Sequence, residues 1–118
     1  MEATTPIFTK TFDFVTWLLN ATNHFPRSQR FAVTKRLLDA GLNFQERLVD
    51  ANACQGKARI KHLGLADAEL DKVRLYLRMA LRWSWLSSGQ YEHAAKQVAE
   101  IGRILGGWKK VTQRPAEA

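Results

Sequence analysis

Three arginines at a regular spacing are the side chains of this chain best suited to bind an anion. Arg74, Arg78 and Arg82 recur every fourth residue, which places them in a row along one side of a helix. Asp71 is the one acidic residue a turn away. Guanidinium groups present planar donor forks to phosphate or carboxylate, so the row predicts an anion-binding surface. The alternative is pairing with acids of neighbouring helices, namely Glu46, Asp50 or Glu100.

Two further basic clusters lie elsewhere in the chain. The first, at the start of the predicted second helix, comprises Arg27, Arg30, Lys35 and Arg36, and the second comprises Lys57, Arg59 and Lys61. Cations at a helix N-terminus oppose the helix dipole, so the first cluster costs stability and indicates a function. Neither cluster contains interleaved aromatic residues of the kind that stack on single-stranded bases, and we expect binding directed at the phosphate backbone with little sequence preference.

The overall charge favours a polyanionic partner. The 118 residues include 18 Lys and Arg against 11 Asp and Glu, for a net charge of +7, and this excess points above all to nucleic acid. The single cysteine excludes an internal disulfide. No segment has the length of a membrane span or the pattern of a signal peptide, so we expect a cytoplasmic protein that does not contact membranes.

Catalytic and metal-ligating constellations are missing from the sequence. His24, His62 and His93 lie in different segments, Cys54 has the character of a small buried residue, and no phosphate-binding glycine loop is present. We therefore predict no cofactor, no metal and no enzymatic activity. The alternative is an all-α enzyme that acts on an anionic substrate by arginine electrostatics alone, but no acid or base partner is evident.

Hydrophobic periodicity predicts four helices and no strands. The expected helices begin at Thr5-Pro6, near Ser28, near Ala66 or Asp67 and at 87–89, and the first two end near Asn23 and near Gln55-Gly56, with 57–64 as a loop or frayed turn. The expected core rows are Phe8, Phe12, Val15 and Leu19; Phe31, Leu38, Leu42 and Val49, widened by Leu37, Phe44 and Leu48; Leu70, Val73, Leu77, Leu81 and Ser84; and Tyr91, Ala94, Val98, Ile101, Leu105 and Trp108.

These helices make a single domain. Short connections between helices of similar length predict an all-α, up-and-down antiparallel four-helix bundle over residues 6–111. Residues 1–5 are expected to be flexible and residues 112–118 to form a disordered tail.

The third predicted helix carries apolar residues on two sides. Leu75, Met79, Trp83 and Leu86 lie roughly opposite its core row, and on the first helix Phe14 and Trp17 also fall outside the expected row. A helix that is apolar on both sides is buried on both sides. We therefore predict self-association; the alternative is a thick core with scattered surface aromatics.

The last predicted helix has a row of small residues beside its core row. Ala95, Ala99, Gly102 and Gly106 make up this row. Glycine within a helix costs about 1 kcal/mol relative to alanine. Its recurrence here predicts close approach of a neighbouring backbone.

Three segments also resemble a known family. YEHAAKQVAEIGRILGGWKK at 91–110, KTFDFVTWLLNATNHFPRSQRFAV at 10–33 and VRLYLRMALRW at 73–83 resemble the accessory variability determinants of diversity-generating retroelements. Those proteins belong to a wider four-helix-bundle family first noted beside intervening sequences in bacterial 23S ribosomal RNA genes. The resemblance covers roughly residues 8–111.

The resemblance implies a function that composition does not. It implies a bacterial homopentameric barrel of four-helix bundles that binds the retroelement's reverse transcriptase and template RNA or DNA through a basic surface, supporting mutagenic retrohoming. Arg74 and Arg78 match the arginines of the family's third-helix pattern, whereas Arg82 and 57–61 match less well. The alternative is the wider family, with an unassigned scaffold or RNA-binding role.

Overall fold

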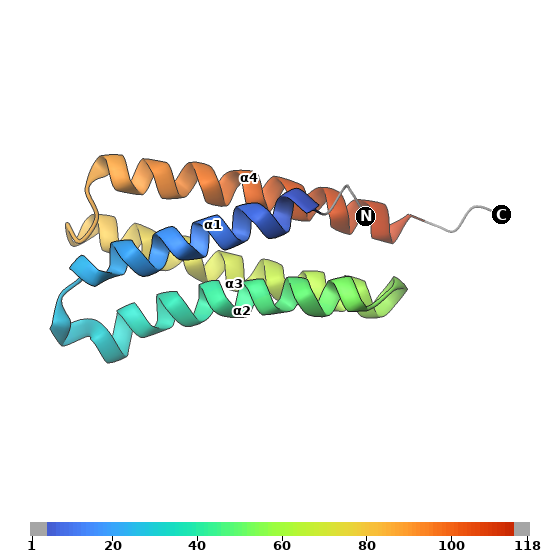
Figure 1. Ribbon diagram of the computed structural model, residues 1–118, viewed down its shortest axis with the longest axis horizontal. Helices are drawn as coiled ribbons and strands as arrows, with labels where there is room; N and C mark the ends of the chain where they lie inside the picture. The colour runs from blue at the N-terminus through green and yellow to red at the C-terminus, as the bar shows by residue number, and fades with distance from the viewer. Residues whose placement is uncertain (1–4, 115–118) are drawn as a thin grey trace.

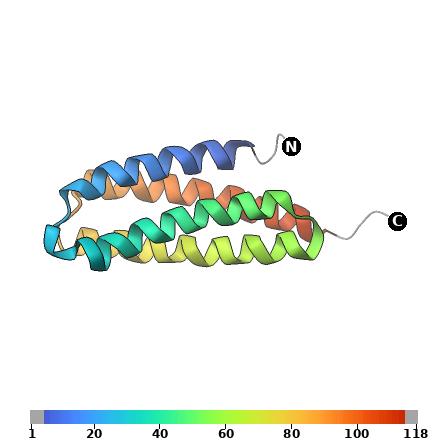
Figure 2. The same ribbon diagram turned by 60° about the horizontal axis from the view of Figure 1, so that its bottom comes forward.

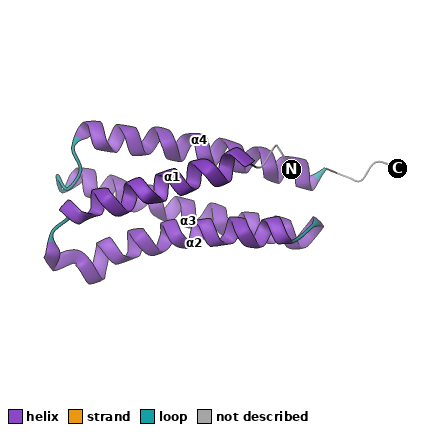
Figure 3. Ribbon diagram, viewed as in Figure 1, coloured by secondary structure: helices purple, strands orange, loops and turns teal. Residues whose placement is uncertain are grey.

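Four helices form an antiparallel bundle in the computed structural model, which describes residues 5–114 (Figure 1). They are α1 (Thr5–Ala21), α2 (Lys35–Ala53), α3 (Gly56–Arg82) and α4 (Ser88–Gln113). Within these residues all regular structure is helical, which confirms the predicted all-α bundle (Figure 3). None of the described helices is both long and apolar enough to cross a membrane.

The predictions for the chain ends fall largely outside the described residues. Residues 1–4 and 115–118 are not described, so the expected flexibility there stays a prediction. Thr5 is already helical, and α4 continues through Gln113 into the segment predicted as a tail.

Short connections decide which parts of the chain share an end of the bundle. The α1–α2 and α3–α4 connections lie at one end, and the α2–α3 connection lies at the other with the N-terminus of α1 and the C-terminus of α4 (Figures 1 and 2). Both α1 and α3 pack mainly against α2 and α4. The two helices α1 and α3 therefore sit diagonally across the bundle.

The core of the bundle runs continuously along α3 and α4. The buried residues of α3 follow a strict three-and-four spacing: Leu63, Ala66, Leu70, Val73, Leu77 and Ala80. On α4 the predicted row is confirmed, with Tyr91 partly buried and the others buried: Ala94, Val98, Ile101, Leu105 and Trp108.

The predicted loop at 57–64 is wrong, because α3 begins at Gly56 rather than near Ala66. Gly56 has a φ of 58°, which permits the tight reversal after Cys54 and Gln55. Leu63 and Ala66 then extend the buried row of α3 by a further turn. Gly64, which suggested a break, lies at an exposed position with open space around it.

The predicted core rows of α1 and α2 are each rotated from the observed ones. Phe12 and Leu19 are exposed on α1, Leu42 and Val49 are exposed on α2, and Phe31 is exposed in the turn before α2. Of the predicted α1 row, Val15 is buried and Phe8 packs against the core. The buried α1 residues outside that row include Ile7, Thr11, Phe14 and Leu18, so Phe14 is a core residue, and Trp17 packs against that core. On α2 the predicted flanking residues Leu37, Phe44 and Leu48 are buried as expected, together with Ala40, Gly41 and Ala51, and Leu38 packs against the core.

The entry to α2 also differs from the prediction. No side chain caps α2 at its first turn, and Ser28 lies within a short 3-10 turn, Arg27–Gln29. A π-helical turn, Arg30–Thr34, follows before regular α-helix begins at Lys35. A π turn widens the backbone spiral and changes which side chains face inward, which accounts for the exposure of Phe31.

The turn after α3 explains why Leu81, Ser84 and Leu86 differ from their predicted places. Ser84 has a φ of 64°, and the amides of Trp85 and Ser84 donate to the carbonyls of Ala80 and Leu81. This is a Schellman motif with serine at the left-handed position. Ser84 is exposed by this turn, and Leu86 returns to the core after it. Leu81 is only half-buried, and Ala80 occupies the core position that was predicted for Leu81.

The predicted cap of α4 is confirmed by a capping box. The Ser87 hydroxyl accepts from the Gln90 amide at 3.1 Å, and the Gln90 side chain accepts from the Ser87 amide at 2.9 Å.

Ser87→Ala should lower the free energy of unfolding by about 0.5–2 kcal/mol, because it removes the hydroxyl that accepts from the Gln90 amide in the first turn of α4. Ser88→Ala is the matched control, since Ser88 is exposed and makes no side-chain hydrogen bond within residues 5–114. Urea denaturation followed by circular dichroism measures both. Equal effects of the two substitutions would show that the box contributes nothing.

Candidate nucleic-acid interface

The arginine row of α3 borders a groove between α3 and α4. This groove has a volume of about 430 Å³, and arginines stand on both of its walls, with Arg74 and Arg78 on α3 and Arg103 on α4. Its floor is formed by small side chains of α4, with Ala95, Ala99 and Gly102 among them. The small residues thus open a cationic groove on the surface.

The predicted backbone contact at the glycines of α4 is wrong. A Cβ added at Gly102 would lie 2.6 Å from Nη2 of Arg74, so Gly102 makes room for a guanidinium group. Gly106 and Gly107 have open space around them. The small-residue row therefore seats an arginine side chain instead of a neighbouring helix backbone.

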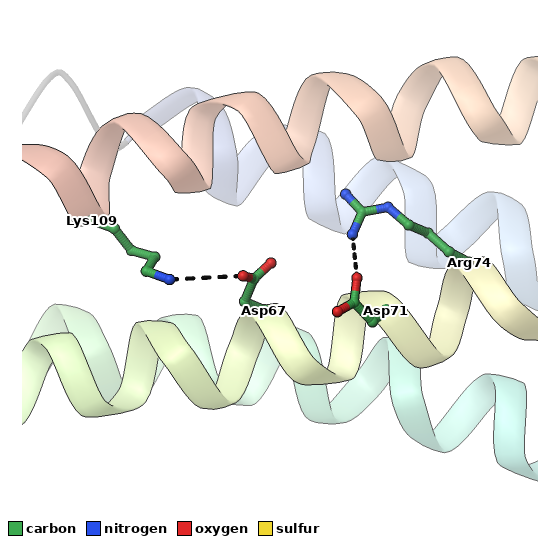
Figure 4. A network of polar contacts seen from close by, with 4 residues as sticks. All are labelled: Asp67, Asp71, Arg74 and Lys109. Carbon is green, nitrogen blue, oxygen red and sulfur yellow. Dashed lines mark hydrogen bonds and ion pairs between the residues drawn. The ribbon is translucent and has the colours of Figure 1, made fainter.

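Arg74 is the one member of the α3 row that is held by a carboxylate. Its Nη1 lies 2.7 Å from Oδ1 of Asp71, one turn earlier on the same flank of α3 (Figure 4). Within residues 5–114, Arg78 and Arg82 make neither an ion pair nor a hydrogen bond. Two guanidinium groups of the row are thus available to an external anion.

The alternative of pairing with acids on neighbouring helices is wrong for this row. Asp50 pairs with Arg47, and Glu46 makes no ion pair within the described residues. Glu100 pairs with Lys10 of α1 and Arg103 of α4. The Lys10 ammonium donates a hydrogen bond to Glu100 and, with Arg103, attracts its negative charge, which lowers the pKa of this carboxyl.

The groove continues toward the C-terminal end of α4. A second hollow of about 280 Å³ shares Gly102 with the first and is lined by Gly106, Lys109 and Lys110. Lys109 reaches across to Asp67 of α3 at 3.7 Å, as Figure 4 shows. Sequence reasoning missed Arg103, Lys109 and Lys110. Their spacing on the flank of α4 was visible, but the groove that joins them to α3 is a tertiary feature.

The other two basic clusters lie at opposite ends of the bundle. Arg27 and Arg30 of the α1–α2 connection and Arg36 in the first turn of α2 have no carboxylate partner within the described chain, whereas Lys35 pairs with Asp39 at 2.6 Å. The α2–α3 connection, at the other end, leads into Lys57 and Lys61, also unpaired within residues 5–114. With α3 spanning 27 residues, about 40 Å separates the two ends, so they do not form one patch.

Arg59 has a structural role, which sets it apart from its cluster. Its Nε donates to the carbonyl of Ala51 at 2.9 Å, near the C-terminus of α2. Its guanidinium also lies 5.6 Å from the ring centre of Trp108. Hydrogen bonding and a cation–π contact both favour holding this side chain in place.

The candidate interface residues divide by burial. Leu75 and Trp83 are 44% and 46% exposed, and Met79 is half-buried. Leu86 is only 3% exposed, because it packs into the core of its own chain. The exposed apolar row of α3 therefore consists of Leu75, Met79 and Trp83.

The histidines and the cysteine are dispersed in the fold. No group of three metal-ligating side chains comes together within residues 5–114. His93 packs against the ring of Trp17 at 5.3 Å, and Cys54 is half-buried after α2. The cationic groove and the two basic ends are the sites that the described structure offers.

The fold and the charge distribution define a class, a cationic four-helix bundle with arginines along an open groove. The chain belongs to the bAvd-like family, whose model matches residues 7–112. This match confirms the resemblance to the accessory variability determinants.

A solved structure has the same fold. It is a protein of unknown function from the S23 ribosomal protein family of Bacteroides thetaiotaomicron, at 21% identity and a TM-score of 0.82, with 93% of this chain and 99% of that chain covered. No curated protein sequence matches the chain. Neither of these two descriptions names an enzymatic activity.

Two alanine substitutions test whether the groove floor seats Arg74. Gly106→Ala should raise the free energy of unfolding by about 1 kcal/mol, because alanine favours helix and the position is open. Gly102→Ala should raise it less, since the new methyl group displaces the Arg74 guanidinium from its place beside Asp71. Urea denaturation of both variants measures the difference. Equal stabilisation would contradict the assigned role of Gly102.

Proposed function

We propose that this protein is a non-enzymatic accessory factor of a diversity-generating retroelement, which binds the element's reverse transcriptase and its template RNA or DNA. Membership of the bAvd-like family supports the accessory role. The single observation that carries the binding role is the α3–α4 groove, where Arg78 lines the wall with no carboxylate partner in the described structure.

The chemistry of the groove suits a phosphate backbone. Arg74, Arg78 and Arg103 present donor forks from two helices to one channel, and such forks bind phosphate oxygens whatever the base sequence. The net charge of +7 adds a long-range attraction that speeds association with polyanions. Binding is thus expected to be strong at low salt and weakly sequence-specific.

Self-association is part of the proposal, with a ring of five copies as the expected form. Exposed apolar residues lie on α3 and, diagonally across the bundle, on α1 and its neighbour α2. One row is Leu75, Met79 and Trp83 on the outer face of α3. The other is on α1 and α2, and consists of Phe12, Leu19, Leu42 and Val49.

These two rows suit a cyclic assembly. Val15 and Leu18 of α1 are the nearest neighbours of Gly41, so the flank of α2 that follows Gly41 lies beside α1. A head-to-tail ring joins two different patches of each copy, whereas a two-fold dimer joins one patch to itself. We infer that the α3 row of one copy contacts the α1–α2 row of the next.

The wider family supplies the second candidate, a scaffold or RNA-binding bundle outside a retroelement. The structural neighbour of unknown function in the S23 ribosomal protein family favours keeping it. A reverse transcriptase gene with template and variable repeats beside the coding gene distinguishes the two.

Nucleic-acid binding should depend on salt and on the unpaired arginines. Log affinity for duplex DNA should fall linearly with log salt, and replacing Arg78 and Arg82 with Ala should make the slope shallower by roughly 1 to 2, since each phosphate contact contributes about 0.7–0.9. Fluorescence anisotropy over a salt series measures this. Lys72→Ala is the control, because Lys72 already pairs with Glu69.

The same arginine variant should lose co-purification with the cognate reverse transcriptase. A wild-type slope and intact co-purification would remove these arginines from the function.

The assembly should depend on the apolar rows. Sedimentation equilibrium at micromolar concentration should give about five times the 13.5 kDa chain mass, and Met79→Glu or Phe12→Glu should each reduce it because a carboxylate in an apolar interface is costly. Val111→Glu, at another exposed apolar position of α4, should leave the mass unchanged. A wild-type monomer would refute the ring.

A further inference from the structure

A cavity lies beside the connection between α1 and α2, residues 22–34, which we call the elbow. Its volume is about 380 Å³, and its walls include Phe25, Pro26, Arg27, Arg30 and Thr34. Pockets of about 300–1,000 Å³ accept small ligands in proteins. The elbow is at the opposite end of the bundle from Lys57 and Lys61 (Figure 2).

One wall of this cavity carries a buried polar group without a partner. Thr34 is 9% exposed, and its Oγ1 makes no hydrogen bond within the described structure. Thr34 closes the π-helical turn that begins at Arg30, and such turns occur often at functional sites. Thr34 lines the cavity, and a ligand oxygen that reached its hydroxyl would recover the free energy that burial without a partner costs.

The cations of the elbow also lack partners. Arg27 and Arg30 both line the cavity. Neither has a carboxylate partner within residues 5–114, whereas Lys35, on the first turn of α2, is paired with Asp39. Two guanidinium groups and one hydroxyl form a donor set that matches the oxygens of a phosphate.

An exposed aromatic ring follows Arg30 in the chain, so the prediction that the first basic cluster lacks an aromatic residue suited to stacking is wrong. Phe31 is 85% exposed, the largest exposed fraction among the large apolar side chains of the described residues. Arg27 and Lys35 lie four residues before and after it, so the ring belongs to a basic stretch of the chain. An apolar protein interface at Phe31 would bury these charges at a cost. A nucleotide instead supplies a base for the ring and a phosphate for the arginines.

We propose that the elbow binds one nucleotide of a single-stranded nucleic acid, with the phosphate on Arg27, Arg30 and Thr34 and the base stacked on Phe31. The inference rests on the proposed nucleic-acid function and assigns part of it to a defined site. In a duplex the bases are paired and stacked on one another, so the elbow selects single strands.

Phe31→Ala tests the stacking. Its affinity for a fluorescently labelled oligothymidine should fall roughly 5- to 100-fold, the usual loss when a stacking aromatic is removed, while its affinity for a matched duplex stays that of wild type. Val111→Ala, which shortens another exposed apolar side chain outside both apolar rows, on α4, is the matched control. Removing the charges of Arg27 and Arg30 together should weaken single-strand binding more than removing those of Lys57 and Lys61.

Thr34→Val separates binding from folding. The substitution keeps the shape of the side chain and deletes a hydroxyl that has no partner within the protein, so the unfolding temperature should hold or rise. Single-strand affinity should nevertheless fall about 2- to 10-fold, the equivalent of one hydrogen bond.

The outcomes distinguish this inference from the function on which it rests. A wild-type protein that binds neither single strands nor duplex overturns both. If the wild type binds nucleic acid, and both Phe31→Ala and Thr34→Val bind single strands as tightly as the wild type does, only the elbow site is overturned. A Phe31→Ala variant with a reduced sedimentation mass would assign the ring to protein assembly and overturn the site as well.

Discussion

Burial of one side of α3 is the constraint on which the rest of the bundle depends. This helix packs against both α2 and α4, and six of its residues at three-and-four spacing are buried. Burying a large aliphatic side chain contributes about 1.5–3 kcal/mol, so the rotation of α3 is fixed. Once Leu70, Val73 and Leu77 face inward, the helix geometry places Arg74 and Arg78 on the flank beside α4. The small residues of α4 then decide whether that flank is filled or open.

The distribution of acids determines which cations stay available. Most carboxylates on α3 and α4 pair locally or with a neighbouring helix, as Asp67 and Asp71 do in Figure 4. The unpaired cations of the described chain include Arg78 and Lys110, which line the α3–α4 hollows, Arg82 of α3, and most of the basic residues at the two ends of the bundle. Unpaired like charges lower the stability of a compact state and strengthen its attraction for a polyanion. The excess of cations over carboxylates thus lowers the stability of the fold and strengthens the binding of a polyanion.

Sequence periodicity predicted the fold class and α4, and it failed where a helix has two apolar sides. On α4 the opposite face is polar or small, so one row alone can enter the core. On α1 and α2, Phe12 and Val49 belong to rows as apolar as the buried ones, and only the packing of partner helices decides between them. The arginine row was predictable because it follows from helical spacing alone. Its groove was not, because Gly102 and Arg103 reach it through tertiary packing.

Local backbone geometry accounts for the remaining differences. Gly56 and Ser84 adopt positive φ at the two ends of α3, and the π-helical turn before α2 shifts the register of Phe31. A glycine in a sequence is equally compatible with a reversal of the chain before a helix and with a break within a helix. The residue pattern here does not predict a π turn. The candidate elbow site depends on that turn, so sequence alone placed Phe31 in the core.

If the copies form a ring, the position of each basic region on the bundle determines what that region can contact. If the outer row of α3 meets the α1–α2 row of the next copy, the two ends of every bundle stay open. Five copies then present five elbows at the same level and five sets of Lys57 and Lys61 at the other level. A single strand that follows one level meets identical weak sites in succession, and each contact raises the effective concentration at the next. Affinity for a long polyanion thus arises from repetition, which is consistent with sites that hold one nucleotide each and read no sequence.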